Sequence, residues 1–239
     1  MPTNKKRRIE EDRISVLPDS LLIHILSFLP AKYAVATCLL SKRWRQLWRF
    51  IATLDLEIAY PDQLEFFVKF VDKLLHSVDL KSVEKCVLDF CYETPPQETS
   101  KWLAMISSRV EQLEIHMCWS SQYELSCCVF LSNSIRVLKL SHGRVNTLSH
   151  VNLPSLEVLH LVDVKFQDFR SLELLLNACS IVKDLFLRYR DVKDFRPLRI
   201  ERLNHLVTAY LSPQSLIPFE AISNIKSLCI KQVRIKHEK

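Results

Sequence analysis

The sequence predicts an α/β protein in two parts: a short helical unit at the N-terminus, followed by a solenoid of parallel strands joined by helices and loops. Two observations predict this fold class. An apolar helical stripe lies between two prolines near the start of the chain, and an apolar six-residue pattern then recurs eight times. Such a pattern predicts a solenoid because one repeat cannot bury its own apolar face, so neighbouring repeats must stack.

Composition is that of a folded globular protein. The chain has 239 residues, of which 48% are hydrophobic and 25% are charged. No apolar run approaches the roughly 18–20 residues of a membrane helix, and no secretory signal follows the N-terminal charges. The eight cysteines include no CxxC pair and no zinc-ligand spacing, which favours reduced, buried thiols. We therefore expect an intracellular protein without a membrane span or a metal site.

The only glycine, Gly143, argues against several classes of enzyme. A P-loop and a GxGxxG motif each need several glycines, and so does a GxSxG elbow. Two Ser-His pairs at 141–142 and 149–150 lie near Asp163 in sequence, but no pattern indicates the oxyanion hole that a catalytic triad needs. The sequence thus predicts a non-catalytic protein with no cofactor.

Basic charge is concentrated at the N-terminus. Residues 1–50 hold ten Lys or Arg and four acidic residues, whereas the remainder holds 23 of each. We expect residues 1–11 to form a disordered basic tail that acts as a weak nuclear signal, which places the protein in the nucleus or cytoplasm. Nucleic-acid binding stays open as an alternative, although the acids at 10–12 weaken it. The basic residues of the tail are Lys5, Lys6, Arg7 and Arg8.

The segment "SVLPDSLLIHILSFLP" (15–30) predicts the first helix. Its apolar residues recur with helical spacing at Leu21, Leu22, Ile25, Leu26 and Leu29. The proline at 18 suits a first helical turn and the proline at 30 stops the helix. A second helix is expected over about 31–39, and a third follows, with Ser41 as its N-cap and apolar residues at 44, 47 and 48. Because so small a unit buries little area, it must dock on the rest of the chain or offer apolar surface to another protein.

The recurring pattern begins at residue 51 and is apolar at its first, fourth and sixth positions, counting Ala and Cys as small apolar residues. Successive segments start 19 to 32 residues apart. A period in the twenties with L-x-x-L-x-L is the signature of leucine-rich repeats. We expect parallel strands on a concave face and helices or loops on the convex face; 169–179 should be one such helix. The segments are IATLDL (51–56), VEKCVL (83–88), VEQLEI (110–115), IRVLKL (135–140), LEVLHL (156–161), VKDLFL (182–187), LVTAYL (206–211) and IKSLCI (225–230).

Residues 12–48 closely resemble an F-box. The markers are Leu17-Pro18, the leucine-rich first helix, Leu29-Pro30 and the closing "SKRWRQLW". Together with the repeats, they resemble the plant F-box/leucine-rich-repeat group. The resemblance implies an F-box at 12–49 and a repeat region at 50–239, with about eight irregular repeats and no clear C-terminal cap.

The resemblance also implies a function and a set of partners. F-box proteins bind a Skp-type adaptor that links them to a cullin in an SCF-type ubiquitin ligase, and their repeats hold the protein target. The chain would then be a non-catalytic substrate-recognition subunit; a decoy or scaffold that delivers no target is the alternative. The residues matched to adaptor contacts, some of which must instead form the unit's own core, are Leu17, Pro18, Leu21, Leu22, Ile25, Leu29, Val35, Leu39, Trp44 and Trp48.

Target binding is expected on the outward positions of the strands. Phe186 and Tyr210 are the best anchors, because exposed aromatic side chains on adjacent strands are frequent hot spots. The mixed charges of this face do not identify a ligand. The candidate residues are Glu114, His116, Lys139, His160, Phe186, Arg188 and Tyr210.

Overall fold

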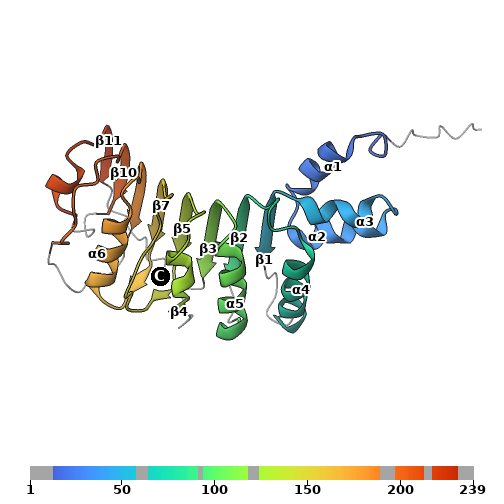
Figure 1. Ribbon diagram of the computed structural model, residues 1–239, viewed down its shortest axis with the longest axis horizontal. Coiled ribbons are helices and arrows are strands. Elements are labelled where there is room, and N and C mark those ends of the chain that lie inside the picture. Colours follow the sequence, from blue (N-terminus) through green and yellow to red (C-terminus); the bar gives the residue numbers. More distant parts are fainter. Residues whose placement is uncertain are drawn as a thin grey trace, which may run out of the picture.

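The computed structural model describes residues 13–57, 64–90, 94–117, 124–188, 197–212 and 217–230. The predicted basic tail, with its run at residues 5–8, lies outside these ranges. Within them, a helical unit sits at one end of a long row of parallel strands (Figure 1). The α/β class and the order of its two parts are as predicted.

The helical unit consists of short elements. They are α1 (Asp19–Leu26), α2 (Ala31–Ala36), α3 (Trp44–Leu47) and the 3₁₀ segments η1 (Thr37–Leu39) and η2 (Trp48–Phe50). Pro18 and Pro30 immediately precede α1 and α2, where a missing backbone N–H costs nothing. The prediction that Ser41 caps the third helix is wrong: Arg43 is the residue before α3, and no side chain caps that helix.

All eight recurring segments form strands of one parallel sheet. Each strand starts at the third residue of its segment, and the spatial order is β1-β2-β3-β5-β7-β9-β10-β11. Neighbouring strands pair without a change of register, so equivalent positions of the segments lie side by side. The strands are β1 (Thr53–Glu57), β2 (Lys85–Phe90), β3 (Gln112–Met117), β5 (Val137–Ser141), β7 (Val158–Val162), β9 (Asp184–Arg188), β10 (Thr208–Leu211) and β11 (Ser227–Ile230).

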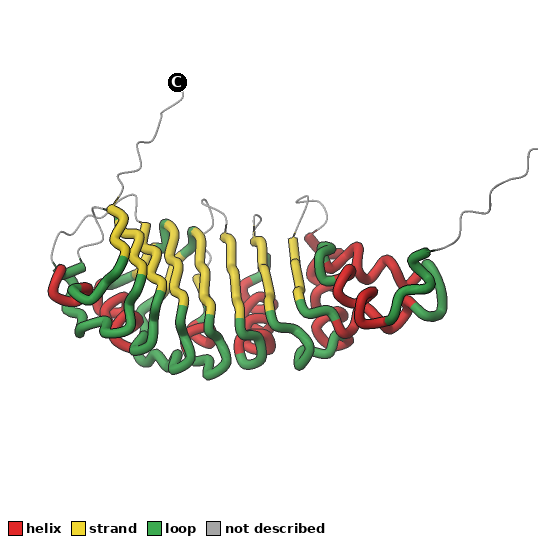
Figure 2. Tube along the Cα trace, turned by 90° about the horizontal axis from the view of Figure 1, so that it is seen from above, coloured by secondary structure: helices red, strands yellow, loops and turns green. Residues whose placement is uncertain are grey.

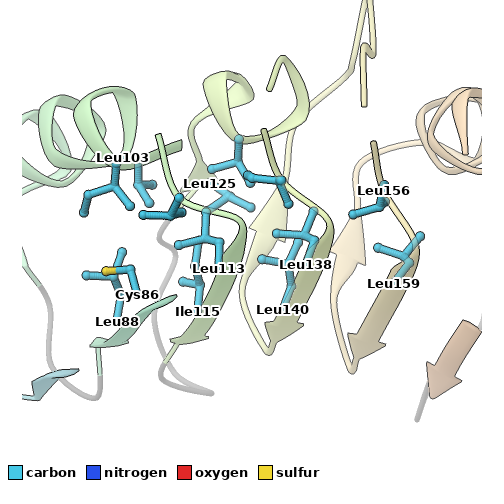
Figure 3. Packing of buried hydrophobic residues seen from close by; sticks show 14 of the residues in the cluster. Cys86, Leu88, Leu103, Leu113, Ile115, Leu125, Leu138, Leu140, Leu156 and Leu159 are labelled. Atoms are coloured by element: carbon cyan, nitrogen blue, oxygen red, sulfur yellow. The ribbon is translucent and has the colours of Figure 1, made fainter. Parts of the chain in front are cut away.

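The fourth and sixth positions of the segments build the core. Leu113 and Ile115 of β3 and Leu138 and Leu140 of β5 are fully buried and point away from the strands toward the helical layer (Figure 3). The alternation of buried and partly exposed residues along each strand follows from the two-residue period of a β-strand. The last strand differs, because Leu228 and Ile230 at the same positions are 39% and 49% exposed.

Helices return the chain between strands and cover one face of the sheet. They are α4 (Leu64–Ser77), α5 (Pro96–Ser107) and α6 (Phe169–Ala178), with 3₁₀ segments η4 (Cys127–Phe130) and η6 (Phe219–Ile222) in other repeats. Figure 2 shows the strands along one side of the molecule and the helices along the other. Helix α6 confirms the predicted helix over 169–179 to within one residue. The opposite face of the sheet carries no described helix, and we call it the open face.

A second, three-stranded parallel sheet was not predicted. Its strands are only two residues long: β4 (Glu124–Leu125), β6 (Arg144–Val145) and β8 (Lys165–Phe166). The turns before β6 and β8 contain positive φ angles at His142, Gly143 and Asp163. At Gly143 the φ of +87° favours glycine, and a Cβ atom there would also displace the flexible end of the Met117 side chain.

The helical unit is joined directly to the first repeat. The backbone N–H of Asp79 donates to the Arg49 carbonyl at 2.8 Å, and the Arg49 guanidinium donates to the Ser77 carbonyl at 2.8 Å. The N–H of Ala52 donates to the Ser27 hydroxyl at 3.0 Å. One buried apolar cluster includes residues from α1 through to β10. The unit therefore forms the N-terminal end of the solenoid.

Candidate protein-interaction surfaces

Helix α1 has two apolar faces with different surroundings. Leu22 and Leu26, four residues apart, are buried in the unit's core. Leu21, Ile25 and Phe28, spaced by four and three residues, are 48%, 44% and 74% exposed. This spacing places Leu21 and Ile25 on one side of the helix, with Phe28 in the turn that follows it, and we call the three residues the outer stripe. Because exposed apolar groups clustered in this way mark interaction sites, the outer stripe is a candidate docking surface.

The residues that the F-box resemblance matched to adaptor contacts fall into three groups. Leu22 and Trp44 are buried, so in this structure they belong to the internal core and present no surface to a partner. Pro18, Leu21 and Ile25 are exposed, and Leu39 is 86% exposed. The third group is partly buried and packs against the core; it consists of Leu17, Leu29, Val35 and Trp48.

Several exposed apolar residues were not predicted as contacts. Phe28 completes the outer stripe, and its spacing from Leu21 and Ile25 was the signal that could have identified it. Leu40 follows Leu39 at the end of η1 and is also exposed, a position that spacing alone does not indicate. The other exposed apolar residues of the helical unit are Ile14, Val16, Tyr33 and, at the junction with the sheet, Phe50.

Two of the arginines in this unit have internal roles. The Arg43 guanidinium bonds to the Asp19 carboxylate at 2.8 Å and to the carbonyls of Ser15 and Leu17, so it fixes the turn before α1. Arg49 bonds to Ser77 across the junction with the sheet. These contacts weaken the nucleic-acid alternative, because they pair two of the unit's cations with groups of the protein itself.

The open face brings the predicted target-binding residues together. Glu114, Lys139, His160, Phe186 and Tyr210 occupy equivalent positions on β3, β5, β7, β9 and β10, and each is paired in register with the next. We call these five residues the central row. All are partly exposed. His116 and Arg188 lie two residues further along β3 and β9, in a parallel row. Their binding role stays a prediction.

Aromatic rings occupy the C-terminal half of the central row. The Phe186 and Tyr210 rings stack with centroids 4.2 Å apart and planes 4° apart, and the His160 ring lies 5.5 Å from Phe186. Burial lowers the pKa of His160, and Lys139 acts in the same direction, against the opposing effect of Asp184. The His160 Nε2 to Asp184 Oδ1 separation of 3.5 Å is too long for a strong hydrogen bond, so burial prevails.

Charged groups occupy the N-terminal half of the open face. Glu114 accepts from Lys139 at 2.9 Å and from Lys85 at 3.0 Å. Burial acts to raise the pKa of Glu114, but the two lysines together outweigh it and the net shift is downward. On β1, burial raises the pKa of Asp55, and the neighbouring carboxylates Glu57 and Asp89 add to the shift. Asp55, Glu57 and Asp89 were not among the predicted contacts, although Glu114 was.

The third charged contact of this face is between Arg188 and Asp163, at 3.1 Å. It links the end of β9 to the positive-φ turn after β7. Among the described residues, no group of three His, Cys, Asp or Glu side chains is placed to hold a metal ion. None of the described helices is long and apolar enough to cross a membrane.

Comparison with known proteins identifies the helical unit. Residues 14–51 match the family model of the F-box domain. These residues include α1, α2, α3 and the outer stripe, and they end two residues before β1 starts. The surface that this structure exposes on α1 thus lies within a recognised domain.

Similar proteins in Arabidopsis thaliana extend the match into the sheet. One F-box/FBD/LRR-repeat protein is 35% identical over 186 residues, which is 75% of this chain and 44% of the relative. Another is 34% identical over 200 residues, or 79% of this chain and 44% of the relative. F-box/LRR-repeat protein 13 is 30% identical over 198 residues, covering 80% and 44% respectively. The chain thus spans less than half the length of these relatives.

No solved structure matches the chain. The domain match and the relatives both agree with the order of helical unit and parallel sheet seen in the structure. The chain carries an F-box domain and is a homologue of the plant F-box proteins with leucine-rich repeats.

Proposed function

We propose that the chain is a non-catalytic subunit of an SCF-type ubiquitin ligase, in which the F-box binds a Skp-type adaptor and the sheet binds a protein target. The observation that carries this proposal is the outer stripe, which exposes three large apolar side chains within the F-box domain. A standard interface buries about 800 Å² on each partner, and each fully buried leucine contributes roughly 1.5–3 kcal/mol.

The repeat region fits the target-binding role. Its strands share the buried positions of the L-x-x-L-x-L pattern, which supports an irregular leucine-rich-repeat solenoid. Relatives named as LRR-repeat proteins add support. We also propose a nuclear or cytoplasmic location, on the basis of the basic run at residues 5–8.

Adaptor binding is tested by co-expressing the full chain with a Skp-type adaptor and measuring complex formation by size-exclusion chromatography. The variant Leu21→Glu/Ile25→Glu places two charges on the outer stripe without touching the buried Leu22. We expect it to lose the complex, because charge buried without a partner costs several kcal/mol. Phe66→Glu is the matched control, since Phe66 on α4 is 77% exposed and lies outside the F-box.

Four outcomes are informative. Loss of the complex in the stripe variant alone supports adaptor docking through α1. Equal binding by the wild type and the stripe variant would show that another surface docks. Failure of the wild-type chain to bind would remove the ligase role altogether. A chain that binds the adaptor but promotes ubiquitination of no captured protein would be a decoy or scaffold.

A further inference from the structure

The open face changes character along its length. On β1–β3 the outward positions hold four acidic residues and one lysine, Lys85. On β7, β9 and β10 they hold one acid and one arginine, together with three aromatic rings. An acidic half therefore adjoins a nearly neutral, aromatic half. The acidic residues are Asp55, Glu57, Asp89 and Glu114.

The acidic half has an excess of negative charge. Lys85 and Lys139 both bind Glu114, and although Lys85 and His116 also act to lower the pKa of Asp55, burial and the carboxylates of Glu57 and Asp89 outweigh them. On β1, Asp55 lies two residues from Glu57. On the neighbouring strand β2, Asp89 pairs in register with Glu57. Like charges placed directly opposite each other on neighbouring strands repel, so a cation above them would be attracted. The pKa of Asp55 is raised first by burial and then by repulsion from the carboxylates of Glu57 and Asp89.

The aromatic half is organised before any ligand arrives. Phe186 and Tyr210 hold each other in a parallel stack, and His160 packs against Phe186. Side chains that are already fixed lose little conformational entropy when they bind, and aromatic residues dominate interface hot spots. Val158 and Val162 flank His160 on β7 and add apolar surface that is partly exposed.

The distance between the halves sets the spacing in a ligand. Four strand steps separate β2 from β9 in the sheet order. At about 4.8 Å per step they cover about 19 Å, which an extended chain spans in about six residues. A single-stranded nucleic acid could stack its bases on the rings, but its phosphates would meet the acidic half. The charges therefore favour a protein segment.

We propose that the open face binds an extended protein segment with Lys or Arg side chains at one end and an aromatic or large aliphatic side chain about six residues away. The basic end lies over β1 and β2, and the apolar end lies against Phe186 and Tyr210. This inference rests on the proposed function, because it names the class of target that the sheet would hold.

The test measures peptide binding to the full chain by fluorescence anisotropy. The probe is a labelled peptide with a Lys-Arg-Lys block, a Gly/Ser spacer of about five residues and a Trp-Leu end. Comparison peptides carry Glu-Asp-Glu in place of the basic block, or only one of the two ends. We expect the complete basic probe to bind most tightly and its affinity to fall as salt is added.

A charge exchange tests the acidic half. Glu57→Lys should weaken binding of the basic probe by about threefold to tenfold and strengthen binding of the acidic probe, because it reverses one exposed charge. Glu220→Lys is the matched control, since Glu220 is exposed on η6 outside the open face. Because Glu57 is exposed, we expect this variant to fold like the wild type.

Truncation of a ring tests the aromatic half. Tyr210→Ala should weaken both complete probes by about tenfold, whereas Phe66→Ala on α4 should weaken neither. Circular dichroism establishes that each variant is folded. The inference is overturned if Glu57→Lys leaves the binding of both probes unchanged, or if Tyr210→Ala and Phe66→Ala have the same effect on binding. It is also overturned if an oligo(dT) probe binds more tightly than the basic peptide.

Adaptor binding by the same samples separates this inference from the proposed function. Loss of peptide selectivity with an intact adaptor complex overturns only the segment chemistry assigned to the open face. An intact peptide preference without an adaptor complex overturns only the ligase role.

Discussion

Adjacent residues of α1 have opposite environments, and this difference decides what each contributes. Leu22 has no exposed surface, whereas Leu21 next to it is half exposed. A helix turns by about 100° per residue, so neighbours in an apolar pair cannot share one face. Stability and docking are therefore carried by different leucines of the same helix.

We predict that Leu22→Ala destabilises the F-box unit by about 2–5 kcal/mol, because it leaves a cavity in a closed core. Leu21→Ala is the matched control and should cost less than about 1 kcal/mol in the isolated chain. Urea denaturation followed by tryptophan fluorescence measures both, since Trp44 and Trp48 lie in this unit. Equal losses would mean that the two leucines share one environment.

We predict that the burial of His160 makes the folded chain less stable at acidic pH. Its pKa in the folded chain is lowered by burial from an ordinary value of 6.5, so the unfolded chain takes up a proton first as the pH falls. The free energy of unfolding should therefore decrease below about pH 6.5, until the lower folded pKa is reached. Measured at pH 7.5 and 5.5, His160→Gln should lose less stability than the wild type. The same loss in both proteins would contradict the assignment.

At the scale of elements, α6 shows how one side chain sets a helix boundary. The Asp168 carboxylate accepts from the Ser171 N–H at 2.7 Å and from the Thr147 hydroxyl at 2.7 Å. The hydrogen bond from Thr147, more than the one from Ser171, lowers the Asp168 pKa. The cap thus also ties α6 to the preceding repeat.

We predict that Asp168→Ala lowers the free energy of unfolding by about 0.5–2 kcal/mol. Asp168→Asn should retain most of that stability, since asparagine caps helices as well as aspartate does. Thermal denaturation near neutral pH measures the difference. Because the folded pKa of Asp168 is lowered, its ionic contribution should be present above the unfolded pKa and lost as the pH falls through the folded pKa.

Elements with a strong period could be predicted, and elements without one could not. The eight sheet strands were predictable because three apolar positions recur in each segment, even in the last one, where these positions are not buried. The strands of the second sheet are two residues long, too short for any periodic signal. The failed Ser41 cap has a similar cause: residue type alone did not show that the helix begins at Trp44.

The candidate surfaces were predictable to a different degree. The central row could be read from the strand pattern, because alternate residues of a strand face the same side. Of the acidic half only Glu114 was predicted, since the charge balance there depends on Lys85 and Lys139 both turning to Glu114, which the sequence does not show. On α1 the sequence showed an apolar helix but not how the core divides it, which depends on the docking of the whole unit.

At the scale of the whole molecule, stability should decrease toward the last strand. Central strands have neighbours on both sides and fully buried core residues, whereas β11 pairs only with β10 among the described strands and exposes Leu228 and Ile230. In a stack of repeats, stability comes from each repeat and its contacts with its neighbours.

We therefore predict that the backbone amides of β3 and β5 exchange with deuterium most slowly and those of β11 fastest among the eight strands. Hydrogen-exchange mass spectrometry on the full chain measures this order. As a paired test, Leu138→Ala in β5 should cost about 2–5 kcal/mol, and Leu228→Ala in β11 should cost clearly less. Uniform protection across the sheet would show that the last strand is covered by something else.

The F-box is joined to the first repeat without a linker, so the two parts form one continuous unit. Hydrogen bonds from Arg49, Ala52 and Asp79 cross that junction. If the adaptor holds one end, the strand on which a target rests fixes its orientation and its reach toward the rest of a ligase. Each strand added or removed would move that target by about 4.8 Å. The number of repeats would then set which lysines of a target come within range, independently of how tightly the target is held.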